Sequence, residues 1–185
     1  MSEFHSMKIA GLDRELKKFP VSDSLDIAAF ILFGDVEITV AAAERLLEKA
    51  PEFDYIITPE AKSIPLAYEM ARQSGKPYIV IRKGVKVYMG NPLEVSVRSI
   101  TTQKEQKLYL GEDEVNLIRG KRVLIVDDVI STGNSLRALE HIVNAAGGEI
   151  VGKMTVLAEG DAINRPDIIA LAPLPLFGPD GNILE

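Results

Sequence analysis

Residues 123–135, with the sequence VLIVDDVISTGNS, decide the fold of this 185-residue chain. Four apolar residues, 123–126, predict a buried strand, and two adjacent carboxylates, Asp127 and Asp128, follow at its carboxyl end. A run of small polar residues then leads into a helix predicted over 134–146. Because open α/β sheets bind ligands outside the carboxyl ends of their strands, we expect a ligand site at this point.

The composition of the turn after the two aspartates predicts that the ligand carries a phosphate. Backbone N–H groups of such a turn, together with a helix N-terminus, favour an anion, and hydroxyl groups add further donors. The two carboxylates would repel a phosphate, so they suit the hydroxyls of a neighbouring sugar or a bridging Mg²⁺. A phosphate beside a diol describes a ribose 5-phosphate. The turn residues are Ser131, Thr132, Gly133, Asn134 and Ser135.

Predicted strands and helices alternate along most of the chain, which is typical of a parallel sheet with helices on both faces. We predict one α/β domain over residues 1–185, with residues 1–20 as a loose N-terminal arm. The predicted strands are 54–58, 78–83, 122–128 and 149–158, the helices are 39–50, 64–74 and 134–146, a hairpin joins 93–100 to 107–110, and 167–177 is an apolar end interrupted by prolines.

Composition excludes several classes of protein. The absence of cysteine excludes disulfides, thiolate zinc sites, iron–sulfur clusters and a cysteine nucleophile. The two histidines, His5 and His141, are too few for a multi-histidine metal site, and we assign neither a role. The formal net charge of −6 argues against a nucleic-acid partner. With no long apolar run and no signal sequence, we expect no membrane contact and a cytoplasmic location.

The motif at 123–135 resembles the phosphoribosyl-pyrophosphate (PRPP) motif of type I phosphoribosyltransferases, in which an apolar strand, two acidic residues and a T-G-x-[ST] turn follow one another. The resemblance covers about residues 19–176. It implies a parallel sheet flanked by helices, with a small hood and a flexible hairpin loop. It also implies that Asp127 and Asp128 hold the ribose hydroxyls while residues 131–135 bind the 5-phosphate. A helix N-cap with two surface aspartates is the alternative, but N-caps seldom need five small residues in a row.

Two further segments resemble the pyrophosphate-binding parts of the purine enzymes. The segment PEAKS, 59–63, is similar to the EARG segment of adenine phosphoribosyltransferases, with a lysine in place of the arginine, and IRKGVK, 81–86, is similar to the end of the next strand. The alternatives are a polar turn and a solvated basic face. The resemblance implies that Glu60, Ala61, Lys62, Ser63, Arg82, Lys83 and Lys86 contact pyrophosphate, and that Asp127, Asp128 and Arg82 are catalytic.

The resemblance also assigns a catalytic loop and a base pocket. Residues 84–106 correspond to the flexible loop that closes over the reacting centre. Their SVRSITTQKEQ segment is closer to xanthine phosphoribosyltransferases than to the SYxLEYG pattern of the adenine enzymes. Residues 27–44 are similar to the hood, where we expect Phe30, Leu32 and Phe33 to line a slot for the flat base.

These features predict a purine-salvage enzyme that transfers the phosphoribosyl group of PRPP to a purine base and releases pyrophosphate. We favour adenine as the base, with xanthine or hypoxanthine/guanine as alternatives, and the resemblance implies Mg²⁺ carried by PRPP and a homodimer. A non-catalytic regulator that binds PRPP or a nucleotide is the alternative from another class. The chain contains neither GxxxxGK[ST] nor GxGxxG, which excludes a P-loop kinase and a dinucleotide enzyme.

Overall fold

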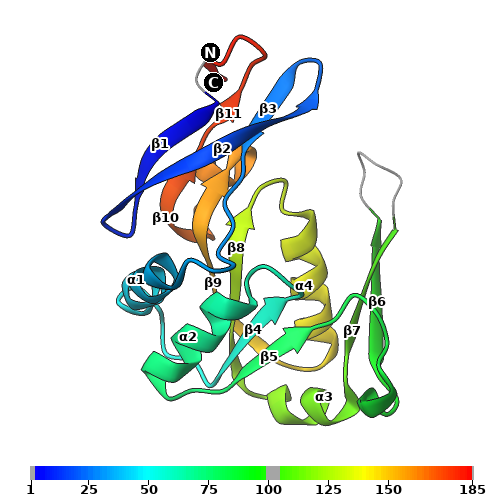
Figure 1. Ribbon diagram of the computed structural model, residues 1–185. Helices are drawn as coiled ribbons and strands as arrows, with labels where there is room; N and C mark the ends of the chain where they lie inside the picture. The colour runs from blue at the N-terminus through cyan, green and yellow to red at the C-terminus, as the bar shows by residue number, and fades with distance from the viewer. Residues whose placement is uncertain (1–2, 99–104, 185) are drawn as a thin grey trace.

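A five-stranded parallel sheet forms the centre of the computed structural model, which describes residues 3–98 and 105–184 (Figure 1). Every neighbouring pair of its strands is parallel, as the alternation of strands and helices predicts. In spatial order the strands are β10 (Ile169–Leu174), β9 (Glu149–Glu159), β8 (Arg122–Ile130), β4 (Tyr55–Pro59) and β5 (Tyr78–Ile81).

Helices cover both faces of this sheet because successive side chains of a strand point to opposite faces. Leu124 and Val126 pack on one face with α1 (Val36–Leu47) and α2 (Ile64–Ser74). Val123 and Ile125 pack on the other face with α4 (Asn134–Ala145). The predicted fold class and the predicted bounds of α2 are confirmed, and α1 begins three residues earlier than predicted, with Asp35 as its cap. A short acidic helix, α3 (Glu112–Ile118), was not predicted.

A second, antiparallel sheet lies over one end of the parallel sheet and joins the two ends of the chain (Figure 1). The prediction of a loose arm over residues 1–20 is wrong, since this segment forms the first two strands of that sheet. Ile9 and Leu16 anchor it because both are buried in the core. The strands, in spatial order, are β1 (Phe4–Ile9), β2 (Leu12–Ser22), β3 (Leu25–Ala28), β11 (Leu176–Phe177) and β12 (Ile183–Leu184).

The predicted hairpin is present as β6 (Leu93–Arg98) and β7 (Glu105–Leu110), which pair in antiparallel fashion after a short 3-10 helix, η1 (Val87–Met89). Arg82 and Tyr109 exchange backbone hydrogen bonds of 3.0 and 2.8 Å, so β7 is attached to the end of β5. Part of the predicted catalytic loop, residues 99–104, lies outside the described residues. In the described part of the chain, no helix has the length and apolar character needed to cross a membrane.

Candidate active site

The two predicted acidic residues lie side by side near the carboxyl end of β8, the middle strand of the parallel sheet. The exposed fractions of Asp127 and Asp128 are only 7% and 3%, so both carboxylates are held away from bulk water. Oδ1 of Asp127 accepts a 2.9 Å hydrogen bond from the backbone N–H of Asp128. Burial, and then the charge of Asp128, raises the pKa of Asp127 well above the ordinary carboxyl range. The pair therefore tends to hold a proton or to bind a ligand that offers donors.

Asp128 forms an ion pair through its Oδ2 atom with a partly exposed lysine. Its Oδ2 atom is buried and, within the described residues, receives no hydrogen bond. The nearest cation is Lys62, whose Nζ lies 3.1 Å away and whose side chain is half exposed. Buried acceptors are seldom left without a donor. A sugar hydroxyl, or a water of a hydrated Mg²⁺, fits such an oxygen.

The predicted phosphate turn lies between β8 and α4 and has the geometry of an anion site. Gly133 is the N-cap residue of α4 with φ = 77°, and as a glycine it has no side chain with which to cap the helix. Thr132 and Ser135 are exposed, and Ser131 and Asn134 are half-buried. The start of a helix favours an anion, and these side chains add polar groups beside it.

The segment 59–63 forms the loop between β4 and α2, as predicted. Its residues differ in their exposure to solvent. Lys62 and Ala61 are exposed, and the peptide bond between Glu60 and Ala61 is cis. Ser63 is buried: its hydroxyl accepts from Thr58 Oγ1 at 2.8 Å and donates to the carbonyl of Pro59 at 3.1 Å. The hydroxyl of Ser63 therefore stabilises the loop from within, and its expected contact with pyrophosphate stays a prediction.

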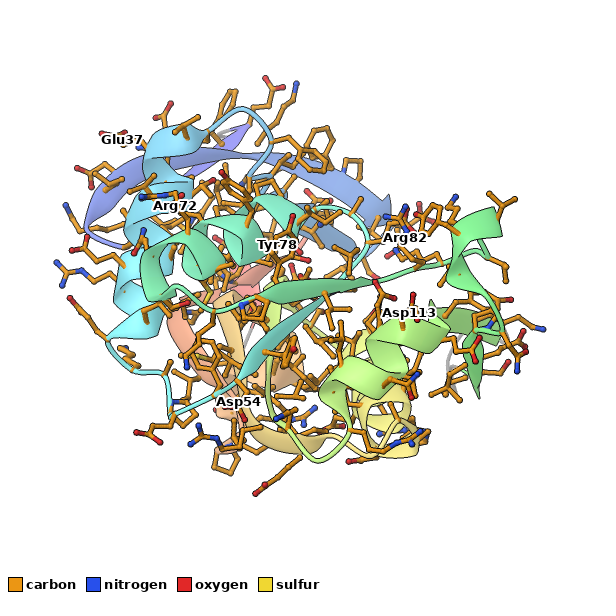
Figure 2. The ribbon with its side chains drawn as sticks, turned by 90° about the horizontal axis from the view of Figure 1, so that it is seen from below. Glu37, Asp54, Arg72, Tyr78, Arg82 and Asp113 are labelled. Carbon is orange, nitrogen blue, oxygen red and sulfur yellow. The ribbon has the colours of Figure 1, made fainter. Side chains whose placement is uncertain are left out.

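The end of β5 lies beside that loop, so the structure brings the two predicted pyrophosphate segments together. Oε2 of Glu60 accepts the backbone N–H of Lys83 at 2.9 Å, and its Oε1 lies 3.7 Å from Arg82. The first of these contacts, followed by the charges of Arg82, Lys86 and Lys83, lowers the pKa of Glu60. Arg82, which Figure 2 labels, also donates from Nη2 to Tyr88 Oη at 2.9 Å. Three cations, Arg82, Lys83 and Lys86, thus lie near Glu60 at the carboxyl end of β5.

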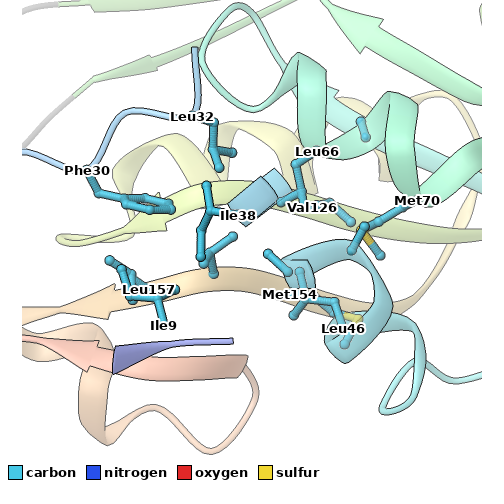
Figure 3. Packing of buried hydrophobic residues seen from close by; sticks show 14 of the residues in the cluster. Ile9, Phe30, Leu32, Ile38, Leu46, Leu66, Met70, Val126, Met154 and Leu157 are labelled. Carbon is cyan, nitrogen blue, oxygen red and sulfur yellow. The ribbon is translucent and has the colours of Figure 1, made fainter. Parts of the chain in front are cut away.

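The residues expected to line the base pocket lie elsewhere. Phe30 and Leu32 are 4% and 1% exposed and pack in the core with Ile38 (Figure 3), because the segment that follows β3 turns its apolar side chains inward. Phe33 points outward and is 56% exposed. This corrects the expectation that a slot at the hood is built from Phe30 and Leu32.

A cavity of about 750 Å³ instead adjoins the phosphate turn, beneath the antiparallel sheet. Thr132 lies at its wall, together with His5 of β1, Leu176 of β11, and Asp161 of the 3-10 helix η2 (Gly160–Asn164). Its size and its mixture of apolar walls with a few polar groups are typical of small-molecule sites. His5 was missed because its position in the cavity depends on the pairing of β1 with β2, which nothing near it in the sequence reveals.

Comparison with known proteins bears on this arrangement. The family model "Phosphoribosyl transferase domain" matches residues 35–172, which include the acidic pair, the phosphate turn and both basic segments. The chain belongs to the phosphoribosyltransferase family. As a phosphoribosyltransferase it is an enzyme that transfers a pentosyl group, and its relatives place it among the purine phosphoribosyltransferases.

Two relatives represent the two kinds of purine enzyme that this phosphoribosyltransferase resembles. The adenine phosphoribosyltransferase of Thermosipho africanus is 33% identical over 84% of this chain and 89% of its own. The hypoxanthine/guanine phosphoribosyltransferase of Methanococcus voltae is 35% identical over 79% of this chain and 72% of its own. Since the two identities are nearly equal, they do not distinguish adenine from the oxopurines.

Solved structures agree on the phosphoribosyltransferase fold. The adenine phosphoribosyltransferase of Thermoanaerobacter pseudethanolicus superposes with a TM-score of 0.72 at 22% identity, over 85% of this chain and 95% of its own. The enzyme of Trypanosoma brucei, solved with AMP, pyrophosphate and ribose-5-phosphate, superposes with a TM-score of 0.65 at 19% identity over 85% of this chain and 76% of its own.

Proposed function

We propose that this enzyme transfers the 5-phosphoribosyl group of PRPP to adenine, with formation of AMP and release of pyrophosphate. The observation that carries the proposal is the juxtaposition, near the carboxyl end of β8, of a buried acidic pair and a helix N-terminus that follows a turn of small residues. The ligands of the T. brucei enzyme, a nucleotide, pyrophosphate and ribose-5-phosphate, are the parts that such a site would hold.

Each end of PRPP has its own binding group in this proposal. The turn at 131–135 binds the 5-phosphate, and Asp127 and Asp128 accept the hydroxyl protons of the ribose. Lys62, Arg82 and Lys83 face the diphosphate, where their charge stabilises the negative charge that develops as the bond to C1 breaks. Mg²⁺ bound to the diphosphate supplies further positive charge there.

The cavity beside Thr132 is the site that we propose for the base. A base bonded to C1 of a ribose whose 5-phosphate occupies the turn must lie close to Ser131 and Thr132, and both residues line this cavity. Leu176 and Ile163 offer apolar surface to the faces of a planar ring, while His5 and Asp161 offer polar groups to its edge.

Hypoxanthine and guanine are the second candidate bases, favoured by the M. voltae relative. A direct test incubates the enzyme with PRPP, Mg²⁺ and adenine, hypoxanthine, guanine or xanthine in separate reactions, with pyrophosphate release as the readout. We expect the largest kcat/KM with adenine. A larger value with hypoxanthine or guanine would replace adenine by that base, and turnover with no purine would overturn the proposal.

We also propose that the enzyme is a homodimer. Phe33, Val36 and Ile31 near the start of α1 are 56%, 72% and 53% exposed, and clustered exposed apolar side chains are typical of protein interfaces. Light scattering on the purified protein is expected to give twice the 20.2 kDa of the chain, and a mass of one chain would refute the dimer.

A further inference from the structure

Arg165, which lies outside every motif of the sequence, contacts the phosphate turn. It follows η2, yet its guanidinium packs against Gly133 at the start of α4. A Cβ atom added to Gly133 would lie 2.6 Å from Nη1 of Arg165, closer than real Cβ contacts come. The absence of a side chain at Gly133 therefore lets a cation approach the turn directly.

Asp167 fixes the direction in which this guanidinium points. It accepts hydrogen bonds from Nε at 3.0 Å and from Nη2 at 2.7 Å, the fork geometry of an arginine–carboxylate pair. The third guanidinium nitrogen, Nη1, does not bond to Asp167, and it is the nitrogen that lies next to Gly133. Within the described residues, Nη1 donates to no acceptor. A charged donor is thus held at the turn with its hydrogen-bonding capacity unused.

A second cation shares the charge of Asp167. Lys153 of β9 donates to the same carboxylate at 2.5 Å and to Glu140 of α4 at 2.6 Å. Asp167 is therefore shared by two cations, and Glu140 supplies the second carboxylate of the network. The network also joins β9, α4 and the segment after η2, so the guanidinium has little freedom to move away from the turn.

We propose that Arg165 binds the 5-phosphate of PRPP through Nη1, with Asp167 as its positioning residue. This inference rests on the proposed function, because it adds one ligand to the phosphate site described there. A phosphate monoester at neutral pH carries close to two negative charges, and a guanidinium pairs with it more strongly than neutral donors do. Neutral N–H and O–H groups of the turn alone would leave that charge without a cation.

Titration calorimetry with two separate ligands tests the inference. In the proposed function, ribose 5-phosphate binds at the turn and the acidic pair, whereas pyrophosphate binds beside Lys62, Arg82 and Lys83. For Arg165→Gln we expect ribose 5-phosphate to bind about tenfold to hundredfold more weakly, with unchanged pyrophosphate affinity. Arg119→Gln is the control, because Arg119 packs its aliphatic Cγ, and not its guanidinium, against Gly147 at the other end of α4, 3.4 Å from an added Cβ. We expect it to bind both ligands as the wild type does.

Two further variants keep the test decisive. Arg165→Lys retains the charge without the fork, and Asp167→Asn retains the arginine but weakens its clamp, so we expect an intermediate loss of ribose 5-phosphate affinity in each. If Arg165→Gln does not fold, these two variants decide. Wild-type affinity for ribose 5-phosphate in the Arg165 variants, or an equal loss for both ligands, would overturn the role of Arg165. Failure of the wild-type protein to bind ribose 5-phosphate would instead overturn the proposed function.

Discussion

The ammonium group of Lys62, in the loop after β4, lies 3.1 Å from Oδ2 of Asp128 in the neighbouring strand β8. One member of this pair is half exposed and the other is almost fully buried, so the lysine is the group that is free to leave. Before PRPP binds, Lys62 neutralises a carboxylate that would otherwise have no partner. In the proposed function, the ribose of PRPP offers hydroxyl donors to Asp128, and Lys62 then turns to the diphosphate.

Replacing Lys62 by methionine should therefore destabilise the free enzyme. The change leaves the buried carboxylate of Asp128 unpaired, and we expect the free energy of unfolding to fall by about 1–2 kcal/mol in urea titrations at pH 7. Lys83→Met is the control, because the hydrogen bond from Lys83 to Glu60 comes from its backbone N–H and its side chain is exposed. We expect a change within about 0.5 kcal/mol. Equal losses in the two variants would show that the ion pair contributes nothing.

The pKa of Asp127 predicts how stability depends on pH. Because burial raises this pKa in the folded protein, the folded state keeps a proton that the unfolded state releases above about pH 4. The stability of the wild type should thus fall as pH rises from 5 to 8, relative to Asp127→Asn, which has no such proton. We expect the free energy of unfolding of the variant minus that of the wild type to increase over this range.

Asp54→Asn serves as the control of opposite sign. Hydrogen bonds from Arg122 lower the pKa of Asp54 to about 2. The contribution of Asp54 is therefore fully present from pH 5 to 8 and is lost only as the pH falls toward 2. Over pH 5–8 we expect a constant difference for Asp54→Asn, and a constant difference for Asp127→Asn as well would contradict the raised pKa.

Gly133→Ala tests whether the turn needs a glycine. A side chain at φ = 77° is strained by about 1–2 kcal/mol, and here it would also displace Nη1 of Arg165. We expect lower thermal stability and weaker PRPP binding. Gly75→Ala at the end of α2 is the matched control, because its φ is 69° with nothing within 4 Å of an added Cβ. It should lose similar stability from strain but bind PRPP normally, and normal binding by Gly133→Ala would contradict the account.

Filling the cavity should separate base binding from PRPP binding. Ile163 lines the cavity and is 43% exposed, so we expect Ile163→Trp to raise the KM for the base about tenfold or more while the affinity for PRPP stays within twofold. Leu117→Trp places the same side chain on an exposed residue of α3, outside the cavity lining, and should change neither constant. An unchanged KM for the base in Ile163→Trp would place the base elsewhere.

Local sequence signals predicted the part of the fold that carries the motif. α2 was predicted to the residue because Pro65 and Gly75 mark its ends, and β8 and α4 followed from an apolar run and a small-residue turn. The hairpin β1–β2 was not predicted, since its exposed face is rich in charge and its stability comes from pairing with β3 and from the burial of Ile9 and Leu16.

The same distinction applies to the site. Asp127, Asp128 and the turn are contiguous in sequence, so their chemistry was visible before the structure. His5 and Arg165 reach the site only through tertiary packing, from β1 and from the segment after η2, and a lone histidine or arginine gives no local signal. Phe30 and Leu32 gave a misleading local signal. They were expected in a base pocket but are buried, because apolar residues near a predicted pocket more often belong to the core.

Calorimetric titration of PRPP with Mg²⁺ into the wild-type enzyme and into the double variant Asp127→Asn/Asp128→Asn tests the central claim most directly. The account predicts that one PRPP binds per wild-type chain, and that the double variant, folded by circular dichroism, binds it at least tenfold more weakly. A wild-type protein that binds no PRPP, or a double variant that binds it equally well, would contradict the site at the end of β8.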